Sequence, residues 1–519
     1  MNIDKTSIGI ELGSTRIKAV LIDGNYSVVA TGASSWENSL IDGIWTYGMD
    51  EVKDGLRKCY KSLKDDFYKK TGMTLRRTGS IGLSAMMHGY IALDKDDNLL
   101  VPFRTWRNTM TEEAADILSS AFDFNIPQRW SIAHLFQAML NNEKHLKNLD
   151  KVFTLSSYVH YLLTGKRVIG IGDASGMFPI DSNTNNWNIG YSEIFSKKAE
   201  EMGYGFSIPS LFPRILVAGE NAGYLTKEGA LLLDAEGDLE EGILFAPPEG
   251  DAGTGMVATN AVRIGSGNTS AGTSDFSMVV MDHIPPRHKE LDMVTTPSGF
   301  PVAMVHCNNC TSDSNYWAML FKEFAMKIDA KISDDDLFSL LYSEALNATS
   351  DPKDDVSCNY YSGEGVTDFN GGVPFFLHKP SSSPSLSSFM RCHLYSALAT
   401  LKMGLDVLKK EDIKIERMMG HGGFFKSEAG IRTLSSAISS PVSVMETAGE
   451  GGAYGMALLS SFLINGKDRT LEEFLEKDVY KDAKVMTIMA TDKEIDDYNE
   501  YISSYRKILE VERKVLEVF

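Results

Sequence analysis

The chain has 519 residues, of which 43% are hydrophobic and 23% charged, as in ordinary soluble globular proteins. This length exceeds what one hydrophobic core supports, so we expect two large domains, at 1–254 and 255–519. The net charge of −19 excludes nucleic acid as a partner, because binding it requires an excess of Lys and Arg to neutralise phosphates.

Targeting and membrane signals are absent from the sequence. A polar start, Met1–Lys5, leads directly into a predicted strand, and no apolar stretch approaches membrane-spanning length. The chain has 5 cysteines, a low and odd number that is typical of a reducing compartment. Cys307 and Cys310 form a single CxxC, which favours two buried thiols over a zinc site. We expect a cytoplasmic protein with no membrane partner, and the sequence leaves a homodimer open.

Apolar periodicity and turn residues predict the elements of the first half. The turn Gly13–Thr15 joins the first two strands into a hairpin. The expected strands are Ser7–Leu12, Arg16–Ile22, Tyr26–Ala30, Arg77–Ser84 and Tyr90–Leu93, and the expected helices are Met49–Thr71, Thr111–Phe122, Ala133–Leu146 and Ser156–Leu163.

The second half restarts with a similar order of strands and turns. The expected strands are Asn260–Gly265, Asn268–Ala271, Phe276–Met281 and Glu416–Gly420, and the expected helices are Cys392–Lys410 and Gly451–Leu463. Residues 381–388 are expected to form a surface loop. In the last segment, apolar residues recur every three or four positions, which predicts a terminal helix packed on the core; they are Ile495, Tyr498, Ile502, Tyr505 and Leu509.

Two turns made of Gly with Ser or Thr, one in each half, have the composition of phosphate-binding turns. Glycine permits close approach, and successive N–H groups can face an anion. Between these turns, the segment Gly250–Gly253 isolates the carboxylate of Asp251 among residues with almost no side chains. It is either a helix N-cap or a base beside a phosphate, and a helix N-terminus suits both. The segment Gly420–Gly423 is either a nucleotide-contacting turn or a strand-to-helix turn.

Taken in order, these segments resemble the motifs of the FGGY family of carbohydrate kinases along nearly the whole chain. The similar segments are Ile8–Ile22 (first phosphate hairpin), Leu83–Gly89 (the SGQMHG segment typical of xylulokinases), Gly172–Gly176 with Trp187-Asn188 (sugar-domain stretch), Gly250–Ala252 (catalytic aspartate), Gly272–Ser274 (second phosphate turn), Gly422–Ser427 (adenosine-site turn) and Glu450–Leu459 (closing helix).

The resemblance implies an α/β fold of two ribonuclease-H-like domains, of the actin/hexokinase type, that face a central cleft. It implies ATP-dependent phosphorylation of a sugar hydroxyl with Mg²⁺, and a ketopentose such as D-xylulose as substrate. The implied site residues are Asp251 as catalytic base; Met87, His88, Trp106 and Asp251 for the sugar; Gly13, Ser14, Thr15, Gly272, Thr273, Gly422, Gly423 and Lys426 for ATP; and Glu11 and Asp251 for the metal ion.

The chain departs from the family pattern at several positions. Glu11 stands where the family usually has Asp, and the sugar-side W-x-D-x-R is Trp106–Met110 here, without the acid and the arginine. A purely structural role stays open for two residues. His88 is then a hydrogen-bonded histidine at a strand end, and Glu11 is bonded to the backbone or to Lys18. The alternative functions are a nucleotide-binding sensor with weak or no catalysis, and an FGGY kinase for another sugar or polyol.

Overall fold

The computed structural model describes residues 2–445 and 451–519. The chain forms two compact units. The first unit contains Met1–Val262, Met293–Val302 and Thr447–Ala483, and the second contains Arg263–Asp292, Ala303–Glu446 and Lys484–Phe519. Among the described residues, no helix combines the length and the apolar character that crossing a membrane requires.

The sheet of the first unit has the strand order β13-β6-β1-β2-β3, with β14 also paired to β6. The first three strands are antiparallel neighbours. Strand β6 runs parallel to β1, and β13 and β14 both run parallel to β6. Their bounds are β1 (Ser7–Leu12), β2 (Arg16–Ile22), β3 (Val28–Ser35), β6 (Ser80–Ala85), β13 (Leu244–Phe245) and β14 (Glu249–Gly250). The predictions for the first two strands are confirmed residue by residue, and the third begins at Val28 rather than at Tyr26.

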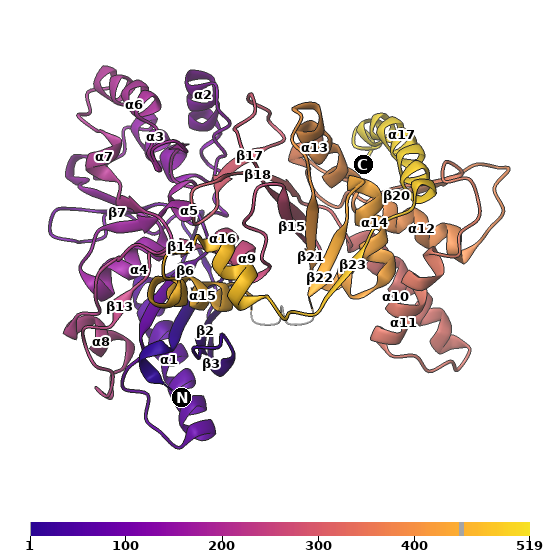
Figure 1. Ribbon diagram of the computed structural model, residues 1–519. Coiled ribbons are helices and arrows are strands. Elements are labelled where there is room, and N and C mark those ends of the chain that lie inside the picture. Colours follow the sequence, from indigo (N-terminus) through magenta and orange to yellow (C-terminus); the bar gives the residue numbers. More distant parts are fainter. Residues whose placement is uncertain (1, 446–450) are drawn as a thin grey trace. The chain divides into compact units, whose positions relative to one another are not determined.

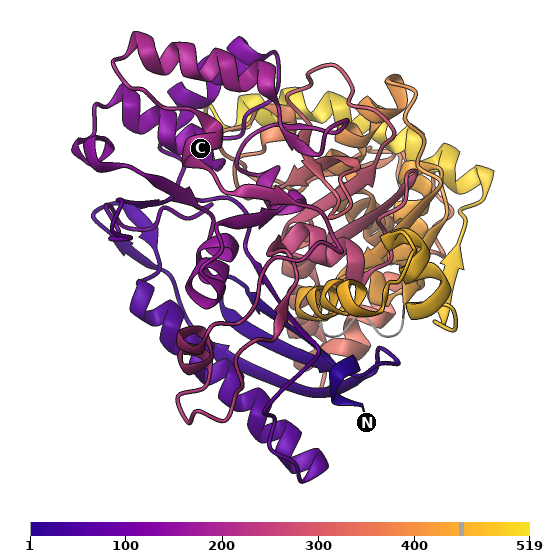
Figure 2. The ribbon, with the colours of Figure 1, turned by 60° about the vertical axis from the view of Figure 1, so that its left-hand side comes forward.

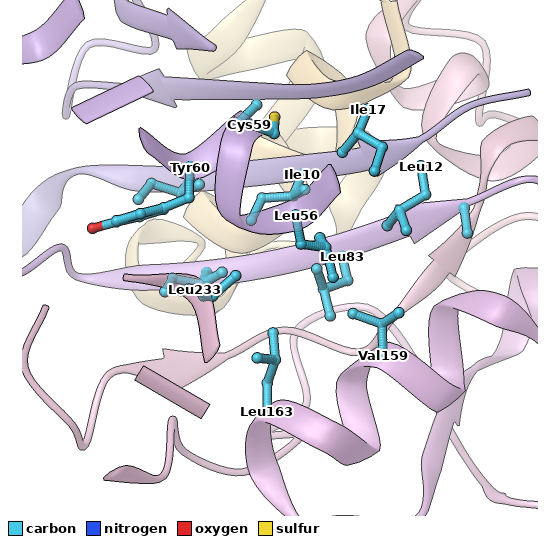
Figure 3. Close-up of a cluster of buried hydrophobic side chains, with 14 of the residues drawn as sticks. Ile10, Leu12, Ile17, Leu56, Cys59, Tyr60, Leu83, Val159, Leu163 and Leu233 are labelled. Atoms are coloured by element: carbon cyan, nitrogen blue, oxygen red, sulfur yellow. The ribbon is translucent and has the colours of Figure 1, made fainter. Parts of the chain in front are cut away.

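Helices cover both faces of this sheet. Helix α1 (Met49–Thr71), with the predicted bounds, packs on β2 and β3, and Figure 3 shows its residues Leu56 and Tyr60 among the buried side chains of the strands. On the other face lies α15 (Gly451–Asn465), which returns from late in the sequence to pack on β1 and β6 (Figures 1 and 2). Its predicted first motif residue, Glu450, lies outside the described residues. The two faces of β1 therefore have different roles: one fills the core, and the other faces α15.

The contact between β1 and α15 depends on Gly9. A Cβ at this position would lie 2.2 Å from the carbonyl oxygen of Ala453 and 2.3 Å from the amide nitrogen of Ala457. Backbone atoms cannot yield at these distances as a flexible side chain would. The two elements approach this closely only because residue 9 has no side chain.

We expect Gly9→Ala to lower the free energy of unfolding by about 3 kcal/mol, because overpacking a well-packed core costs this much when the backbone has to shift. Thermal and urea unfolding of the purified variant would measure the loss. The matched control is Gly205→Ala, because nothing lies within 4 Å of a Cβ built there. Equal stability of the two variants would contradict the close packing of α15 on β1.

The remaining elements of the first unit surround the sheet. They are β4 (Ser39–Ile41), β5 (Ile44–Thr46), β7 (Ile91–Leu93), β8 (Lys151–Phe153), β9 (Val168–Gly170), β10 (Ile180–Asp181), β11 (Asn186–Trp187), β12 (Arg214–Leu216), α2 (Glu112–Phe122), α3 (Ser131–Leu140), α4 (Leu155–Thr164), α5 (Ile171–Ala174), α6 (Ile189–Glu201), α7 (Ile208–Leu211), α8 (Lys227–Leu233), α9 (Asp251–Ala258) and α16 (Leu471–Phe474), and β17 (Asp292–Thr295) begins at the boundary. The predicted helix Ala133–Leu146 is too long: α3 ends at Leu140, because Asn142 has a left-handed φ of 49°.

The main sheet that contains strands of the second unit has the order β17-β18-β16-β15-β21-β22-β23. Antiparallel β15 and β16 form the second predicted hairpin, and β21 lies parallel to β15. The bounds are β15 (Ser266–Ala271), β16 (Asp275–Val280), β18 (Pro301–Cys307), β19 (Asp355–Cys358), β20 (Phe375–His378), β21 (Arg417–His421), β22 (Val442–Met445), β23 (Val485–Ile488), α10 (Ser312–Lys327), α11 (Asp334–Ala345), α12 (Leu386–Ala397), α13 (Ala399–Lys410), α14 (Glu428–Ile438) and α17 (Asp492–Val515).

Three predictions for this unit are wrong or incomplete. The stretch Asn260–Gly265 forms turns and not a strand, and both of its end residues have positive φ. The single predicted helix Cys392–Lys410 is two helices, α12 and α13, because Leu398 leaves helical geometry with φ −109° and ψ 7°. The predicted loop at 381–388 ends earlier, where α12 begins.

Two other predictions are confirmed. The terminal helix α17 buries Tyr498, Ile502 and Tyr505 in a hydrophobic cluster of the second unit. The thiols of Cys307 and Cys310 are both buried, and neither forms a disulfide.

Candidate active site

Predicted site residues of the first unit gather at the carboxyl ends of β1, β6 and β14. The strands are parallel neighbours: Leu12 pairs with Ala85, and Ala85 with Gly250. The residues that follow each strand therefore meet at one edge of the sheet. There the Oδ1 atom of Asp251 accepts hydrogen bonds from the backbone N–H of Met87 at 3.2 Å and of Ala252 at 3.0 Å.

Asp251 has the properties of a general base. It is the first residue of α9, and its side chain is open to solvent. The dense protein around it nevertheless removes enough water to raise the pKa of the carboxyl from 3.8 to about 6, against the opposing effect of the backbone hydrogen bonds. A base with a pKa near the working pH is ionised and still holds a proton well. Its two oxygens also keep acceptor capacity for a substrate hydroxyl.

Glu11 lies next to Asp251, on the face of β1 that contacts α15. Its Oε1 atom is 2.4 Å from where a Cβ on Gly452 would be, so the carboxylate occupies space that only a glycine leaves free. Burial and the charge of Asp251 raise the pKa of Glu11 to about 7, while Lys18, opposite on β2, and a hydrogen bond from the Ala453 backbone lower it. The backbone and Lys18, the two partners expected if Glu11 is only structural, are thus both present, and so is the carboxylate of Asp251.

The donors around Glu11 fit a hard cation. The charge of Asp251 disfavours the ionised form of Glu11, and a positive ion near both carboxylates would relieve this repulsion. The buried hydroxyls of Ser84 and Thr254 lie 3.1 Å apart beside them, and Thr254 Oγ1 is 2.9 Å from the Cβ position of Gly452. Oxygen-only donors with few carboxylates suit Mg²⁺, which keeps waters and phosphate oxygens as most of its ligands.

A second pair of carboxyl groups is buried behind Asp251. Asp173 accepts hydrogen bonds from the hydroxyls of Thr154, at 2.6 Å, and of Ser156. Glu249 accepts from the backbone N–H groups of Gly172 at 3.3 Å and Asp173 at 3.0 Å. Burial and the charge of Asp251 raise the pKa of Asp173 to about 7, and burial and the charge of Asp173 raise that of Glu249 to about 8. This pair ties the segment 172–176 to β14, the strand that directly precedes Asp251.

His88 follows Met87 with a left-handed φ of 69° and is buried. Its Nδ1–H donates to the Gly176 carbonyl at 3.2 Å, because its Nε2 accepts from Arg129 Nε at 3.1 Å and must be unprotonated. Burial and the Arg129 charge hold the pKa of His88 well below its usual value, so the ring is neutral. Both ring nitrogens thus have protein partners, which agrees with the alternative that His88 is a hydrogen-bonded structural histidine at a strand end.

Trp106 lies on a separate loop of the first unit and is 38% exposed. The guanidinium of Arg107 stacks over the rings of Trp45, at 4.9 Å, and Trp106, at 5.7 Å. Asn108, which replaces the acid of the family pattern, accepts from the Trp45 N–H and donates to its carbonyl, both at 2.9 Å. An Asp carboxylate has no N–H to donate to the Trp45 carbonyl. Asn108 therefore makes two hydrogen bonds to the backbone of β5, where Asp would make one. Within the described ranges, no hydrogen bond or ring contact joins Trp106 to Met87, His88 or Asp251.

Predicted nucleotide residues of the second unit also lie together. Gly272 and Thr273 form the turn between β15 and β16, and Gly422 follows β21, the parallel neighbour of β15. A Cβ on Gly422 would lie 2.6 Å from the Ala271 carbonyl oxygen, and its φ of 99° requires glycine. Thr311 braces the first turn, donating to the Gly272 carbonyl through its N–H at 3.0 Å and its Oγ1 at 2.8 Å.

Gly423 and Lys426 bound a short 3₁₀ turn that leads into α14, and the Lys426 side chain is exposed. The turn thus has the form of a strand-to-helix connection, with an available cation at its end. Both alternatives for the segment Gly420–Gly423 are compatible with this geometry, because a strand-to-helix turn presents N–H groups as an anion site does.

Two α/β units, each with a hairpin that ends in a glycine-rich turn, define the actin- and hexokinase-like class of fold. Residues 6–238 match the N-terminal domain, and residues 267–463 the C-terminal domain, of the FGGY family of carbohydrate kinases. The chain belongs to this family, which confirms the predicted family, fold class and enzyme class. The boundary predicted between 254 and 255 lies between the two matches and stays a prediction.

Two xylulose kinases are similar in sequence to this chain over most of their length. The chain is 23% identical over 469 residues to a xylulose kinase of Haemophilus influenzae, covering 86% of this chain and 89% of that one. It is 20% identical over 476 residues to a xylulose kinase of Staphylococcus xylosus, with coverages of 88% and 90%. Among solved structures, a xylulose kinase from Rhodospirillum rubrum has a TM-score of 0.80 at 17% identity, covering 99% of this chain and 100% of that one.

Kinases named for other substrates have similar folds. A gluconate kinase from Lactobacillus acidophilus has a TM-score of 0.77 at 17% identity, with 98% of both chains covered. A Plasmodium falciparum glycerol kinase with ADP has a TM-score of 0.74 at 14% identity, again with 98% of both chains covered. The fold is thus shared by kinases of different substrates, and the substrate of this chain is a question for its own residues.

Sequence reasoning assigned no role to four residues of this site, although Asp173 lies within the predicted sugar-domain stretch Gly172–Gly176. Arg129 and Asp173 contact it from segments distant in sequence, and no motif marks Arg129. Glu249 had a signal, since it is a second carboxylate in the same glycine-rich segment as Asp251. Trp36 directly follows β3 and contacts the turn Gly13–Thr15. This contact depends on the register that pairs Ser35 with Arg16, which the sequence alone does not show.

Proposed function

We propose that this chain phosphorylates a hydroxyl of a ketopentose such as D-xylulose, with ATP as the phosphoryl donor and Asp251 as the general base. The observation that carries the proposal is the geometry of Asp251: a solvent-accessible carboxylate of raised pKa, held by the Met87 N–H where β6 and β14 end. The relatives that match over most of their length are xylulose kinases, which supports the ketopentose, as does the segment Met87–Gly89.

In the proposed reaction, the carboxylate of Asp251 accepts the proton of the sugar hydroxyl while that oxygen forms its bond to the γ-phosphorus of ATP. The bond from this phosphorus to the β,γ-bridging oxygen breaks, and ADP leaves with that oxygen. Little covalent chemistry is required of the protein, so positioning and charge stabilisation supply most of the acceleration. When bound, Mg²⁺ neutralises phosphate charge, and Glu11 and Asp251 are the carboxylates that would hold it.

The remaining predicted residues divide between the two units in this proposal. Met87, His88 and Trp106 line the sugar site of the first unit. His88 contributes as a neutral ring oriented by Arg129 and by the Gly176 carbonyl. The nucleotide is bound by the turn Gly13–Thr15 of the first unit and, in the second unit, by Gly272, Thr273, Gly422, Gly423 and Lys426. A homodimer and a cytoplasmic location stay predictions, and light scattering measures the first.

The test is ADP formation by the purified protein with D-xylulose, L-ribulose, L-rhamnulose, gluconate and glycerol. We expect kcat/KM for D-xylulose to exceed that for glycerol by at least about 10²-fold, because a site built for buried hydroxyls rejects analogues that lack them. A clear preference for glycerol or an aldohexose would contradict the ketopentose. Tight ATP binding with no turnover on any of these compounds would favour the nucleotide-binding sensor.

A further inference from the structure

Two aromatic side chains of the first unit contact the carbonyl side of the turn Gly13–Thr15. We propose that Trp36 and Tyr47 are positioning residues that direct the N–H groups of this turn toward the phosphate that is transferred. The inference rests on the proposed function, since it assigns the turn to ATP. It adds to that function two side chains that bind no substrate and act through the backbone of the turn.

Three successive carbonyl groups of the turn accept hydrogen bonds from this pair. The indole Nε1–H of Trp36 donates to the Gly13 carbonyl at 2.7 Å, and the Tyr47 hydroxyl donates to the Ser14 carbonyl at 2.7 Å. The backbone N–H of Trp36 donates to the Thr15 carbonyl at 3.2 Å. The turn is closed by the Gly13 N–H, which donates to the Arg16 carbonyl at 2.9 Å.

These bonds determine where the amides of the turn point. In a trans peptide the C=O of one residue and the N–H of the next point in opposite directions. Because the carbonyls of Gly13 and Ser14 face the aromatic pair, the N–H groups of Ser14 and Thr15 face away from it. In the described part of the chain, neither of these two N–H groups has an acceptor. Two adjacent amides of a turn that have no acceptor form an anion-binding nest.

The aromatic pair is itself held rigidly. The rings of Trp36 and Tyr47 stack with centroids 4.2 Å apart and are 8% and 2% exposed. The side chain of Asn38 hydrogen-bonds the Tyr47 hydroxyl and accepts from Arg107, which lies over Trp45. The orientation of the turn is thus fixed by packed, hydrogen-bonded side chains from the ends of β3 and β5, as precise positioning requires.

The location of the turn identifies the phosphate. The turn follows β1 directly, and the end of β1 pairs with β6, which in turn pairs with β14 immediately before Asp251. A phosphate held at the end of β1 is therefore the one beside the base, which is the γ-phosphate in the proposed reaction. Removing a donor from Trp36 or Tyr47 should therefore lower the affinity for a nucleoside triphosphate and leave the affinity for a diphosphate unchanged.

Trp36→Phe and Tyr47→Phe test the inference, because each removes one donor and keeps an aromatic ring. Isothermal titration would measure the affinity of each purified variant for a non-hydrolysable ATP analogue and for ADP, both with Mg²⁺. We expect the affinity for the analogue to fall about 5- to 10-fold, the effect of one neutral hydrogen bond, with the affinity for ADP unchanged. The kcat of the kinase reaction should fall by a similar factor, with the KM for the sugar unchanged.

Tyr60→Phe is the matched control, because it removes a buried hydroxyl on α1 that has no hydrogen-bond partner. We expect this control to keep wild-type affinity for both nucleotides. Unchanged affinity in both test variants, or equal loss for analogue and ADP, would overturn the inference. If Trp36→Phe does not fold, Tyr47→Phe alone decides. If the wild type phosphorylates none of the sugars, the proposed function fails, but the comparison of analogue with ADP still decides the inference.

Discussion

Asp251→Asn is expected to lower kcat by about 10² to 10⁴, the usual effect of losing a general base. The amide keeps the size of the carboxylate and still accepts the N–H bonds of Met87 and Ala252. It accepts no proton from the sugar hydroxyl, so the chemical step slows, and the loss of a carboxylate that would hold Mg²⁺ adds to the fall in kcat. Steady-state ADP formation would measure kcat, and titration calorimetry would show unchanged binding of sugar and of ATP analogue.

Asp65→Asn serves as the matched control, since Asp65 is exposed on α1 and its ion pair with Lys61 is at the surface. This variant should have wild-type kinetics. Near-normal kcat in Asp251→Asn, with a folded protein, would show that Asp251 is only the N-terminal residue of α9 and that the base lies elsewhere.

The pH profile offers an independent check on the same residue. Because the dense protein around Asp251 removes water and raises its pKa to about 6, the carboxyl becomes protonated as the pH falls through 6 and loses its basic form. We expect kcat/KM to decrease tenfold per pH unit below this value and to be flat just above it. In Asp251→Asn the acidic limb should disappear from the remaining activity. An acidic limb that persists in this variant would assign it to another group.

Glu11→Ala is expected to raise the Mg²⁺ concentration needed for half-maximal rate at least 10-fold and to lower kcat by about 10², in line with the loss of a metal-orienting group. The reason is the pairing of two carboxylates beside the Ser84 and Thr254 hydroxyls, which suits a hard cation. Titrating Mg²⁺ against rate at fixed ATP would measure both effects.

Two further variants separate the metal role of Glu11 from a structural one. Glu11→Gln keeps the size and the hydrogen bond from Ala453 but removes the charge, so it should behave as Glu11→Ala does. Glu11→Asp keeps the charge one methylene closer to the backbone and should retain measurable activity, with water able to fill the gap. If Glu11→Ala has the wild-type Mg²⁺ dependence, Glu11 serves only the contact with α15.

The sequence by itself determined the elements that local patterns encode. The spacing of apolar residues predicted β1, β2, α1 and α17, because alternation and 3.6-residue periodicity follow directly from which side chains are buried. The glycine-rich segments predicted Asp251 and both phosphate turns, since each depends on residues adjacent in the chain. The ordered motifs were sufficient for the FGGY family, which the comparisons confirm.

Only the tertiary structure decided which distant residues complete the site. Arg129 orients His88, Asp173 pairs with Glu249, and Trp36 holds the turn after β1, and none of these contacts has a local signature. The same holds for α15, which belongs to the first unit although it comes late in the chain. The physical reason is that strand pairing and helix packing join residues by register and shape, which depend on the whole chain, whereas hydrophobic periodicity and turn composition depend on neighbouring residues alone.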